Sequence, residues 1–411
     1  MKRTAACVVF AALATAARAQ LNDQPNSTAM NDAEMALMDQ ASGTSRNPAA
    51  APMPMIMKAA GAWHFMFMAT AFLTDLQQSG PRGHDKFYSV NWGMVSAEHH
   101  LGRGAISVDV MLSLEPLTVT DRRYPELFQT GETAYGVPLV DAQHPHNLIM
   151  AAGIHYLRPI SEYTTLHLYL APVGDPALGP VAFPHRASAA ELPQAPLSHH
   201  WQDSTHVAYE VVTAGISQHW FKVEASGFHG REPNENRWNI NTGAIDSWSG
   251  RLSFAPSANW SAQVSAGRVA HPEALEPGDV VRATASVSYD KTMRRGHWDS
   301  TLIWGRNHNT ATHADGNSYL AETVFPATRA NLLTARAELV DKDELFPGSN
   351  ISYRIGAITA GYTHDIATPG PFETGIGANV TTYRVPSAIQ PAYGVHPVAV
   401  NVYVRVRLRP H

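Results

Sequence analysis

The chain has only one cysteine among 411 residues, Cys7, and it lies close to the amino terminus. Cys7 falls within an apolar, alanine-rich run, residues 5–17, that follows a basic start and leads into the small-x-small sequence of residues 17–19. This is the pattern of a secretory signal peptide, so residues 1–19 are predicted to be removed and the mature chain to begin at Gln20. The mature protein then has no thiol, which excludes disulfides and cysteine metal sites.

Long apolar runs, a basic stripe and enzyme fingerprints are also missing. Beyond the signal peptide, no run reaches the roughly 20 apolar residues of a transmembrane helix, so helical membrane spans are not expected. The chain has 30 Lys and Arg against 35 Asp and Glu, a net charge of −5, and nucleic acid is not expected as a partner. No GxSxG, phosphate-binding loop or dinucleotide motif is present, so an enzymatic role has only the composition of Asp203, Ser204 and His206 in its favour.

What the chain does contain is residue alternation. From Ile106 to Leu114 every second side chain is aliphatic, whereas the intervening ones include Ser107, Asp109 and Ser113. Successive side chains of a β-strand point to opposite faces, so this segment predicts a strand with one apolar and one mostly polar face. Such a strand fits a half-buried sheet in a soluble protein, and it equally fits a barrel with lipid outside and water inside.

The same period of two recurs in about sixteen segments between Trp63 and Arg409. Short links that carry turn residues, such as 99–104 and 256–259, alternate with longer ones. This alternation is typical of outer-membrane barrels, which have short periplasmic turns and long extracellular loops. The long links, all expected at the extracellular rim, are 118–146, 172–204 and 229–249.

Together with the signal peptide, this pattern resembles the bacterial outer-membrane β-barrel proteins. The resemblance implies an all-β fold in which residues 61–411 form one antiparallel up-and-down barrel of about sixteen strands, or fourteen because Asn317–Thr323 has a weak pattern. Residues 20–60 are polar, show no sustained period and are interpreted as a flexible or partly helical, Met-rich arm. The expected location is the outer membrane of a Gram-negative cell, with the lipid bilayer and the barrel assembly machinery as partners.

A barrel also explains the charged residues within the alternating segments. A charge on the lipid face costs on the order of 2–4 kcal/mol at the midplane, less for Asp than for Arg or Lys, so the polar set of each strand should face the lumen. The predicted lumen-lining residues are Asp109, Glu115, His167, Glu210, Lys222, Glu224, Arg282, Arg336, Glu338, Arg405, Arg407 and Arg409.

Methionine is concentrated before and within the first predicted strand, since eight of the thirteen lie between Met30 and Met68. His64 and Met66 share one face of that strand with Met68, and Met111 lies on the inward face of another. Thioether sulfur suits Cu(I), and imidazole suits copper or zinc. The arrangement resembles the Met- and His-bearing arms of outer-membrane copper-resistance barrels, which implies a copper site. The alternative is that the methionines fill gaps in a plug or wall.

Histidine is concentrated in two long loops, in the stretches DAQHPHN and HHWQDSTH. Both loops are expected at the same barrel mouth, where their imidazoles and carboxylates could meet and bind a metal ion. The alternative is that the imidazoles hold the loops by hydrogen bonds. The candidate ligands are His144, His146, His199, His200 and His206.

These patterns predict an outer-membrane channel or transporter for small hydrophilic solutes or ions, with a link to copper or another soft metal. Copper ions are the only cofactor implied. A barrel-scaffolded enzyme and a structural surface protein are the alternatives. The lumen discriminates among them: an open pore favours transport, a His/Asp/Ser triad at the rim favours catalysis, and a plugged barrel without sites favours a structural role.

Overall fold

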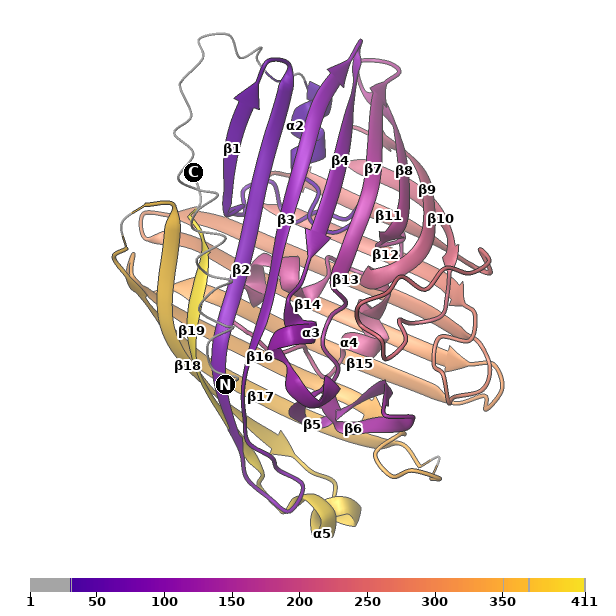
Figure 1. The fold of residues 1–411 in the computed structure, drawn as a ribbon, viewed down its shortest axis with the longest axis vertical. Helices are drawn as coiled ribbons and strands as arrows, with labels where there is room; N and C mark the ends of the chain where they lie inside the picture. The colour runs from indigo at the N-terminus through magenta and orange to yellow at the C-terminus, as the bar shows by residue number, and fades with distance from the viewer. Residues whose placement is uncertain (1–29, 31, 350, 369, 410–411) are drawn as a thin grey trace.

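A computed structural model describes residue 30 and residues 32–349, 351–368 and 370–409. The predicted signal peptide lies outside the described residues. Seventeen antiparallel strands form one sheet, in which sixteen strands close into a barrel and one short strand lies beside them (Figure 1). The prediction of an all-β barrel with about sixteen strands is therefore confirmed.

Consecutive barrel strands pair with one another around the wall. Asn317–Thr323 lies inside a strand that pairs with both neighbours, so the fourteen-strand alternative is wrong. The barrel strands are β2 (Trp63–Gln78), β3 (Lys86–Leu101), β4 (Gly104–Leu112), β7 (Ile149–Pro159), β8 (Thr164–Gly174), β9 (Ala208–Gln218), β10 (Phe221–His229), β11 (Ser247–Ser257), β12 (Trp260–Val269), β13 (Val280–Met293), β14 (Gly296–Asn309), β15 (Asp315–Pro326), β16 (Asn331–Lys342), β17 (Tyr353–Ile366), β18 (Phe372–Arg384) and β19 (Val398–Leu408).

The barrel closes between its first and last strands. One part of β2, Thr70 to Gln78, pairs with β19, and the other part, Trp63 to Met68, pairs with β1 (Met55–Ala60). β1 thus supplies backbone hydrogen-bond partners for the part of β2 that β19 does not reach. Unpaired backbone groups at lipid depth are costly, which explains why the seam uses an additional strand from a region without a periodic pattern.

The outer wall is apolar and the inner wall is polar. On β4, Val108 and Val110 are exposed, whereas Ser107 and Asp109 are buried. An exposed apolar wall bounded by aromatic rings is the surface that a bilayer covers, so the sheet is a transmembrane barrel. None of the helices in the described part of the chain has the length and hydropathy of a membrane-spanning helix. Exposed aromatic residues at the strand ends with short turns include Trp63, Tyr163, Trp220 and Trp260.

Part of the N-terminal segment lies inside the barrel. We call residues 32–54 the arm; it begins with α2 (Asp32–Met38), whose Leu37 packs against Ala105 of β4 and Leu157 of β7. Further along the arm, Thr44 Oγ1 accepts a hydrogen bond from Arg251 Nη2 of β11 at 2.7 Å. The arm therefore crosses the interior from one wall to another.

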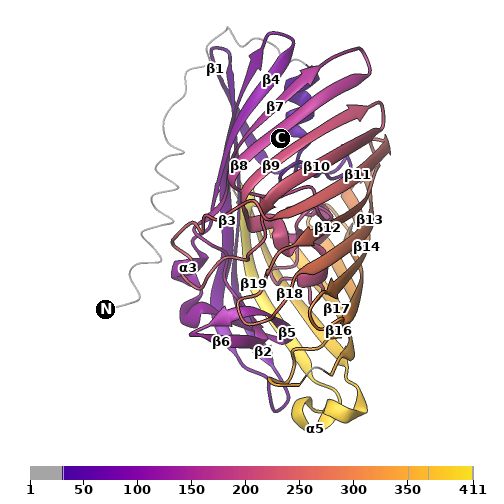
Figure 2. The same cartoon turned by 90° about the vertical axis from the view of Figure 1, so that its right-hand side faces the viewer.

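The link between β8 and β9 also enters the barrel. Residues 175–207, which we call the internal loop, are buried almost throughout and lie within the ring of strands (Figure 2). The prediction that 172–204 is an extracellular rim loop is therefore wrong. The internal loop contains η2 (Phe183–His185), η3 (Ala187–Ala189), α4 (His199–Gln202) and η4 (Ser204–Val207).

Buried ion pairs fix the internal loop to the wall. Arg186 Nε lies 2.5 Å from Glu322 Oε1 of β15, and Glu191 pairs with Arg405 of β19. Glu338 of β16 accepts a hydrogen bond from the hydroxyl of Ser198 at 2.9 Å. Buried charges persist where partners satisfy them, so these charged wall residues are explained by the loop that they bind.

The link between β4 and β7 forms a small structure of its own at the end of the barrel that carries the long loops. It holds α3 (Glu115–Thr118), η1 (Thr120–Arg122) and the hairpin of β5 (Tyr124–Ala134) and β6 (Val137–Gln143) (Figure 1). Almost every residue of β5 is buried, so no alternating pattern revealed this strand. The last strand link contributes η5 (Ser387–Ile389) and α5 (Gln390–Tyr393) at the same end.

Candidate metal-binding site

The histidines of the two predicted loop segments meet inside the barrel. The ring of His199 lies 5.2 Å from the rings of both His200 and His206, centroid to centroid. His146 lies 5.3 Å from His206, and His144 lies 5.9 Å from His200. We call these five residues the histidine cluster. The two histidine-rich segments were expected to meet, and they do. The meeting point lies inside the barrel, because the internal loop runs through the lumen.

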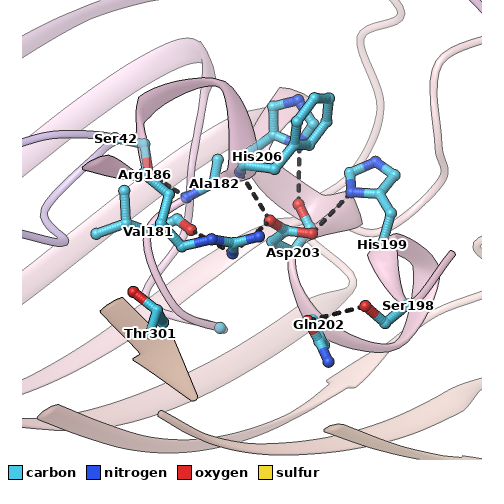
Figure 3. Close-up of polar contacts among 12 residues, drawn as sticks. Ser42, Val181, Ala182, Arg186, Ser198, His199, Gln202, Asp203, His206 and Thr301 are labelled. Atoms are coloured by element: carbon cyan, nitrogen blue, oxygen red, sulfur yellow. Dashed lines mark hydrogen bonds and ion pairs between the residues drawn. The ribbon is translucent and has the colours of Figure 1, made fainter. Parts of the chain in front are cut away.

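Asp203 orients two imidazoles of the cluster (Figure 3). Its Oδ1 accepts a hydrogen bond from His199 Nδ1 at 2.7 Å, and its main-chain oxygen accepts one from His206 Nδ1 at 2.8 Å. Its Oδ2 accepts from the backbone N–H of Phe183 at 2.8 Å and lies 3.3 Å from Arg186 Nη1. Because both Nδ1 atoms donate to oxygen, Nε2 is the nitrogen with the lone pair on each ring.

Burial keeps three imidazoles of the cluster neutral. Burial, only partly offset by Asp203, lowers the pKa of His199 to about 4. Burial likewise lowers the pKa of His144 and of His206 well below the usual range. A neutral imidazole carries the lone pair that binds a metal ion. At neutral pH these three rings are therefore in the protonation state of a metal ligand.

His200 has a different environment. Its ring lies against the backbone of Gly131, where a Cβ would come within 2.4 Å of the ring, and neither ring nitrogen has a hydrogen-bond partner. Its Nδ1 is 3.6 Å from Glu232 Oε1 and 3.7 Å from Glu273 Oε1. Burial alone would lower the pKa of His200, but these two carboxylates outweigh burial and raise the pKa to about 10.

Two groups of three potential ligands share His200. One group adds His144 and His199, and the other adds Glu232 and Glu273; within each group, one ligand atom of every residue lies within 4.8 Å of the others. Imidazole nitrogen and carboxylate oxygen are the donors of many zinc and copper sites. The cluster therefore has the donor set and the compactness of a metal site.

Two further predicted ligands, His146 and His64, also contact carboxylates. His146 Nδ1 lies 3.0 Å from Glu115 Oε1, and its backbone N–H donates to the other oxygen of Glu115 at 2.7 Å. His64 Nδ1 lies 3.3 Å from Glu34 Oε1 of α2. His64 thus forms a contact between the first strand and the arm.

Methionine side chains gather in a pocket of about 50 Å³ between the arm and β2–β4. We call it the methionine pocket. His206 of the histidine cluster and His185 of the internal loop are part of its lining, so thioethers and imidazoles adjoin one another. Its methionines include three predicted ligands and three others, namely Met66, Met68, Met111, Met38, Met53 and Met94.

Most of the predicted lumen-lining residues are buried or face segments inside the barrel. Arg282 of β13, for example, donates to the main-chain oxygen of His200 at 2.6 Å. Glu210 departs from the others, because it is partly exposed and alternates with the buried Tyr209 and Val211. Arg409 is exposed beyond the end of β19. The buried members are Asp109, Glu115, His167, Lys222, Glu224, Arg282, Arg336, Glu338 and Arg405, and Arg407 is partly buried beside Glu191.

A larger cavity, about 300 Å³, lies between the arm, the internal loop and the wall. Its lining includes His146 of the cluster as well as Arg407 and Glu373 near the end with short turns. The interior of the barrel is thus divided by the arm and the internal loop into separate spaces. The methionine pocket and this cavity both border His185.

Several residues of the site had no signal in the sequence. Glu232 follows β10 and Glu273 follows β12, and each is one of several acids in a polar link without a motif. Glu132, whose Oε1 is 3.0 Å from His144 Nε2, belongs to the β5–β6 hairpin. Gly131 has no side chain, and this leaves room for the ring of His200. Only the folded loops place these residues beside His200.

Comparisons with known proteins identify the fold. No family model and no curated protein matches the chain. Several solved structures resemble it, including two porins. The anion-selective porin from Comamonas acidovorans has 12% sequence identity and a TM-score of 0.53, and covers 84% of this chain and 100% of its own. OmpF of Salmonella typhi, solved in complex with daunomycin, has 9% identity and a TM-score of 0.52, and covers 85% of this chain and 100% of its own.

The fold is that of a porin barrel. At these identities the similarity concerns the fold alone and does not transfer a solute. The porin-type barrel, with its apolar outer wall, is an outer-membrane protein of the Gram-negative type embedded in the lipid bilayer. The predicted fold class and location are therefore confirmed.

Proposed function

We propose that the protein is an outer-membrane channel or transporter for small hydrophilic solutes or ions, and that a soft metal ion, copper first, is a solute that it handles. The barrel supports the first part, because a closed wall with a polar interior is the structure that carries solutes across a bilayer. The contents of the interior support the second part.

The observation that carries the copper proposal is the position of His206. Its imidazole belongs to the histidine cluster and also lines the methionine pocket, and its Nε2 is buried without a hydrogen-bond partner. Thioethers of Met66, Met68 and Met111 lie in the same lining. Neutral sulfur and imidazole donors favour Cu(I) over hard cations such as Mg²⁺.

The arrangement also suggests an order of contacts. The methionine pocket lies beside the arm, towards the short turns, and the histidine cluster lies beside the long loops. An ion would pass between thioether and imidazole donors through His206. Because the internal loop, which carries His199, His200 and His206, occupies the lumen, passage requires this loop to shift within the barrel.

The test is copper binding by a variant in which leucine replaces Met66, Met68 and Met111. Leucine keeps the approximate volume and hydrophobicity, so the barrel should fold. We expect Cu(I) bound per chain to fall by about one equivalent and copper tolerance of cells that express the protein to fall with it. The control replaces Met35 and Met57, which are exposed and outside the pocket. If the pocket variant and the wild type bind equal amounts of Cu(I), the copper proposal is wrong and the protein is a general solute channel.

A further inference from the structure

We infer that His200, Glu232 and Glu273 form a binding site for a divalent cation of the zinc type at the barrel mouth, separate from the methionine pocket. His144 and His199 stand beside His200 as further donors. We call the three residues the mouth site. It includes two ligands, Glu232 and Glu273, that neither the loop motifs nor the copper proposal contains.

The distances within the mouth site favour a bound ion over direct hydrogen bonds. His200 Nδ1 lies 3.6 Å and 3.7 Å from the nearest oxygens of Glu232 and Glu273. Hydrogen bonds between nitrogen and oxygen are about 2.7–3.2 Å long, so both separations exceed that range. Ligands of a tetrahedral zinc ion, with bonds of about 2.0–2.1 Å, are about 3.3 Å apart. A cation could therefore fit among these atoms after a small contraction, and its binding would release to solvent the proton that the two carboxylates otherwise hold on His200.

His200 is buried without hydrogen-bond partners, and Glu232 and Glu273 beside it are partly buried. His200 is 6% exposed, yet both of its ring nitrogens lack a hydrogen-bond partner, and so does Oε2 of Glu232. Buried polar atoms without partners are costly and call for an explanation such as an ion. Glu273 is oriented by the backbone N–H of Glu132, which donates to its Oε2 at 2.8 Å and leaves Oε1 towards His200. This is the outer support typical of a metal ligand.

The site joins three segments of the chain. Glu232 and Glu273 come from different loops, which are linked by a hydrogen bond from the backbone N–H of Glu232 to the carbonyl oxygen of Pro272 at 3.0 Å. His200 comes from α4 of the internal loop. A cation at the mouth site would thus fasten the internal loop to two loops at the barrel mouth and hold the interior closed.

The donor set selects the class of cation. One imidazole with two carboxylates, and further imidazoles nearby, contains no sulfur and suits Zn²⁺ better than Cu(I). Mg²⁺ and Ca²⁺ prefer six or more oxygen ligands, which these residues do not provide. The mouth site and the methionine pocket should therefore prefer different metals.

The test uses the full chain, purified in detergent and stripped of metal, with Zn²⁺ titrated by calorimetry. We expect about one Zn²⁺ per chain, and E232Q/E273Q should bind it at least tenfold more weakly. E276Q is the matched control, because Glu276 is an exposed glutamate of the same loop as Glu273. The leucine variant of Met66, Met68 and Met111 should bind Zn²⁺ like the wild type, which separates this proposal from the copper proposal.

Binding of Zn²⁺ by E232Q/E273Q within twofold of the wild type would overturn the inference. A second measurement does not depend on the variant. Zn²⁺ added to the wild-type protein, but not Mg²⁺, should slow proteolysis within residues 230–246 and 270–279. Equal cleavage with and without Zn²⁺ would also overturn the inference and leave His200 as an imidazolium between two carboxylates.

Discussion

At the scale of single residues, charged side chains inside the barrel each bind several partners and so hold the interior segments in place. Asp203 holds His199, His206 and the backbone of Phe183, and lies beside Arg186. The carboxylate is 2% exposed, so every one of these contacts is formed away from water. If one member of such a buried group is removed, the remaining charges stay buried without a partner of opposite charge.

Asp203→Asn should destabilise the internal loop by about 3 kcal/mol, because the buried Arg186 loses one of its two carboxylate partners and His199 loses an anionic acceptor. The measurement is chemical unfolding in detergent, followed by tryptophan fluorescence. Asp315→Asn is the control, since Asp315 also pairs with cations but is exposed and should change the unfolding curve little. Similar curves for the two variants would contradict the role assigned to Asp203.

Gly131→Ala should impair the mouth site without removal of any ligand. A Cβ at Gly131 would lie 2.4–2.6 Å from the ring atoms of His200, so the ring must leave the position in which it faces Glu232 and Glu273. We expect the affinity for Zn²⁺ to fall about tenfold. Gly136→Ala is the control, because Gly136 has a positive φ in the same hairpin but open space around it. Equal Zn²⁺ affinities for both variants would exclude a steric role for Gly131.

At the scale of elements, the arm and the internal loop stabilise each other inside the barrel. The hydroxyl of Ser42 donates to Asp175 Oδ2 at 2.8 Å, at the point where the internal loop leaves β8. Burial raises the pKa of Asp175 to about 7, although Arg251 and Ser42 act in the opposite direction. The contact between arm and loop therefore contains a carboxyl group that titrates near neutral pH.

The stability of this contact should decrease as the pH rises. The pKa of Asp175 is higher in the folded state than its usual value of 3.8, so its contribution is complete below pH 3.8 and is lost as the pH rises through about 7. The shift corresponds to at most roughly 4 kcal/mol. Protease cleavage of the arm should thus be faster at pH 8 than at pH 5, and Asp175→Asn should reduce the difference. If the pH dependence of cleavage is unchanged in this variant, titratable groups other than Asp175 cause it.

At the scale of the whole molecule, a porin-type barrel is filled by two parts of its own chain. The internal loop is fixed to the wall through Arg186 and Glu191, and the arm through Leu37 and Thr44. A barrel of this strand number has room for an aqueous channel unless its lumen is occupied. The occupied interior favours a gated or selective route over a wide pore.

Replacement of residues 177–205 by a short Gly-Ser link should raise the single-channel conductance in planar bilayers several-fold, because it removes the internal loop while the paired strands remain. The wild type should conduct weakly. A deletion in the exposed link at residues 311–313 is the control and should keep the conductance of the wild type. A large wild-type conductance would contradict the closed interior. Gel mobility that changes on heating checks that each variant forms the barrel.

The sequence by itself determined the wall of this protein. Alternation in segments such as Ile106–Leu114 predicts which side chains face lipid, because the geometry of a strand fixes the two faces locally. The same holds for the strand number and for the turns. Methionine content and the two histidine-rich stretches pointed to residues that do come close together, Met66, Met68 and Met111 in one pocket and His199, His200 and His144 in one cluster.

Only the tertiary structure decided what fills the barrel. The inward course of the internal loop depends on pairs such as Glu191 with Arg405, which are far apart in the sequence and leave no periodic pattern. β1 and the β5–β6 hairpin were missed for a related reason, since their environment is set by neighbouring segments and not by two alternating faces. Glu232 and Glu273 reach His200 through loop conformation alone. Strand faces are local and regular, whereas the contacts of irregular segments depend on the whole closed barrel.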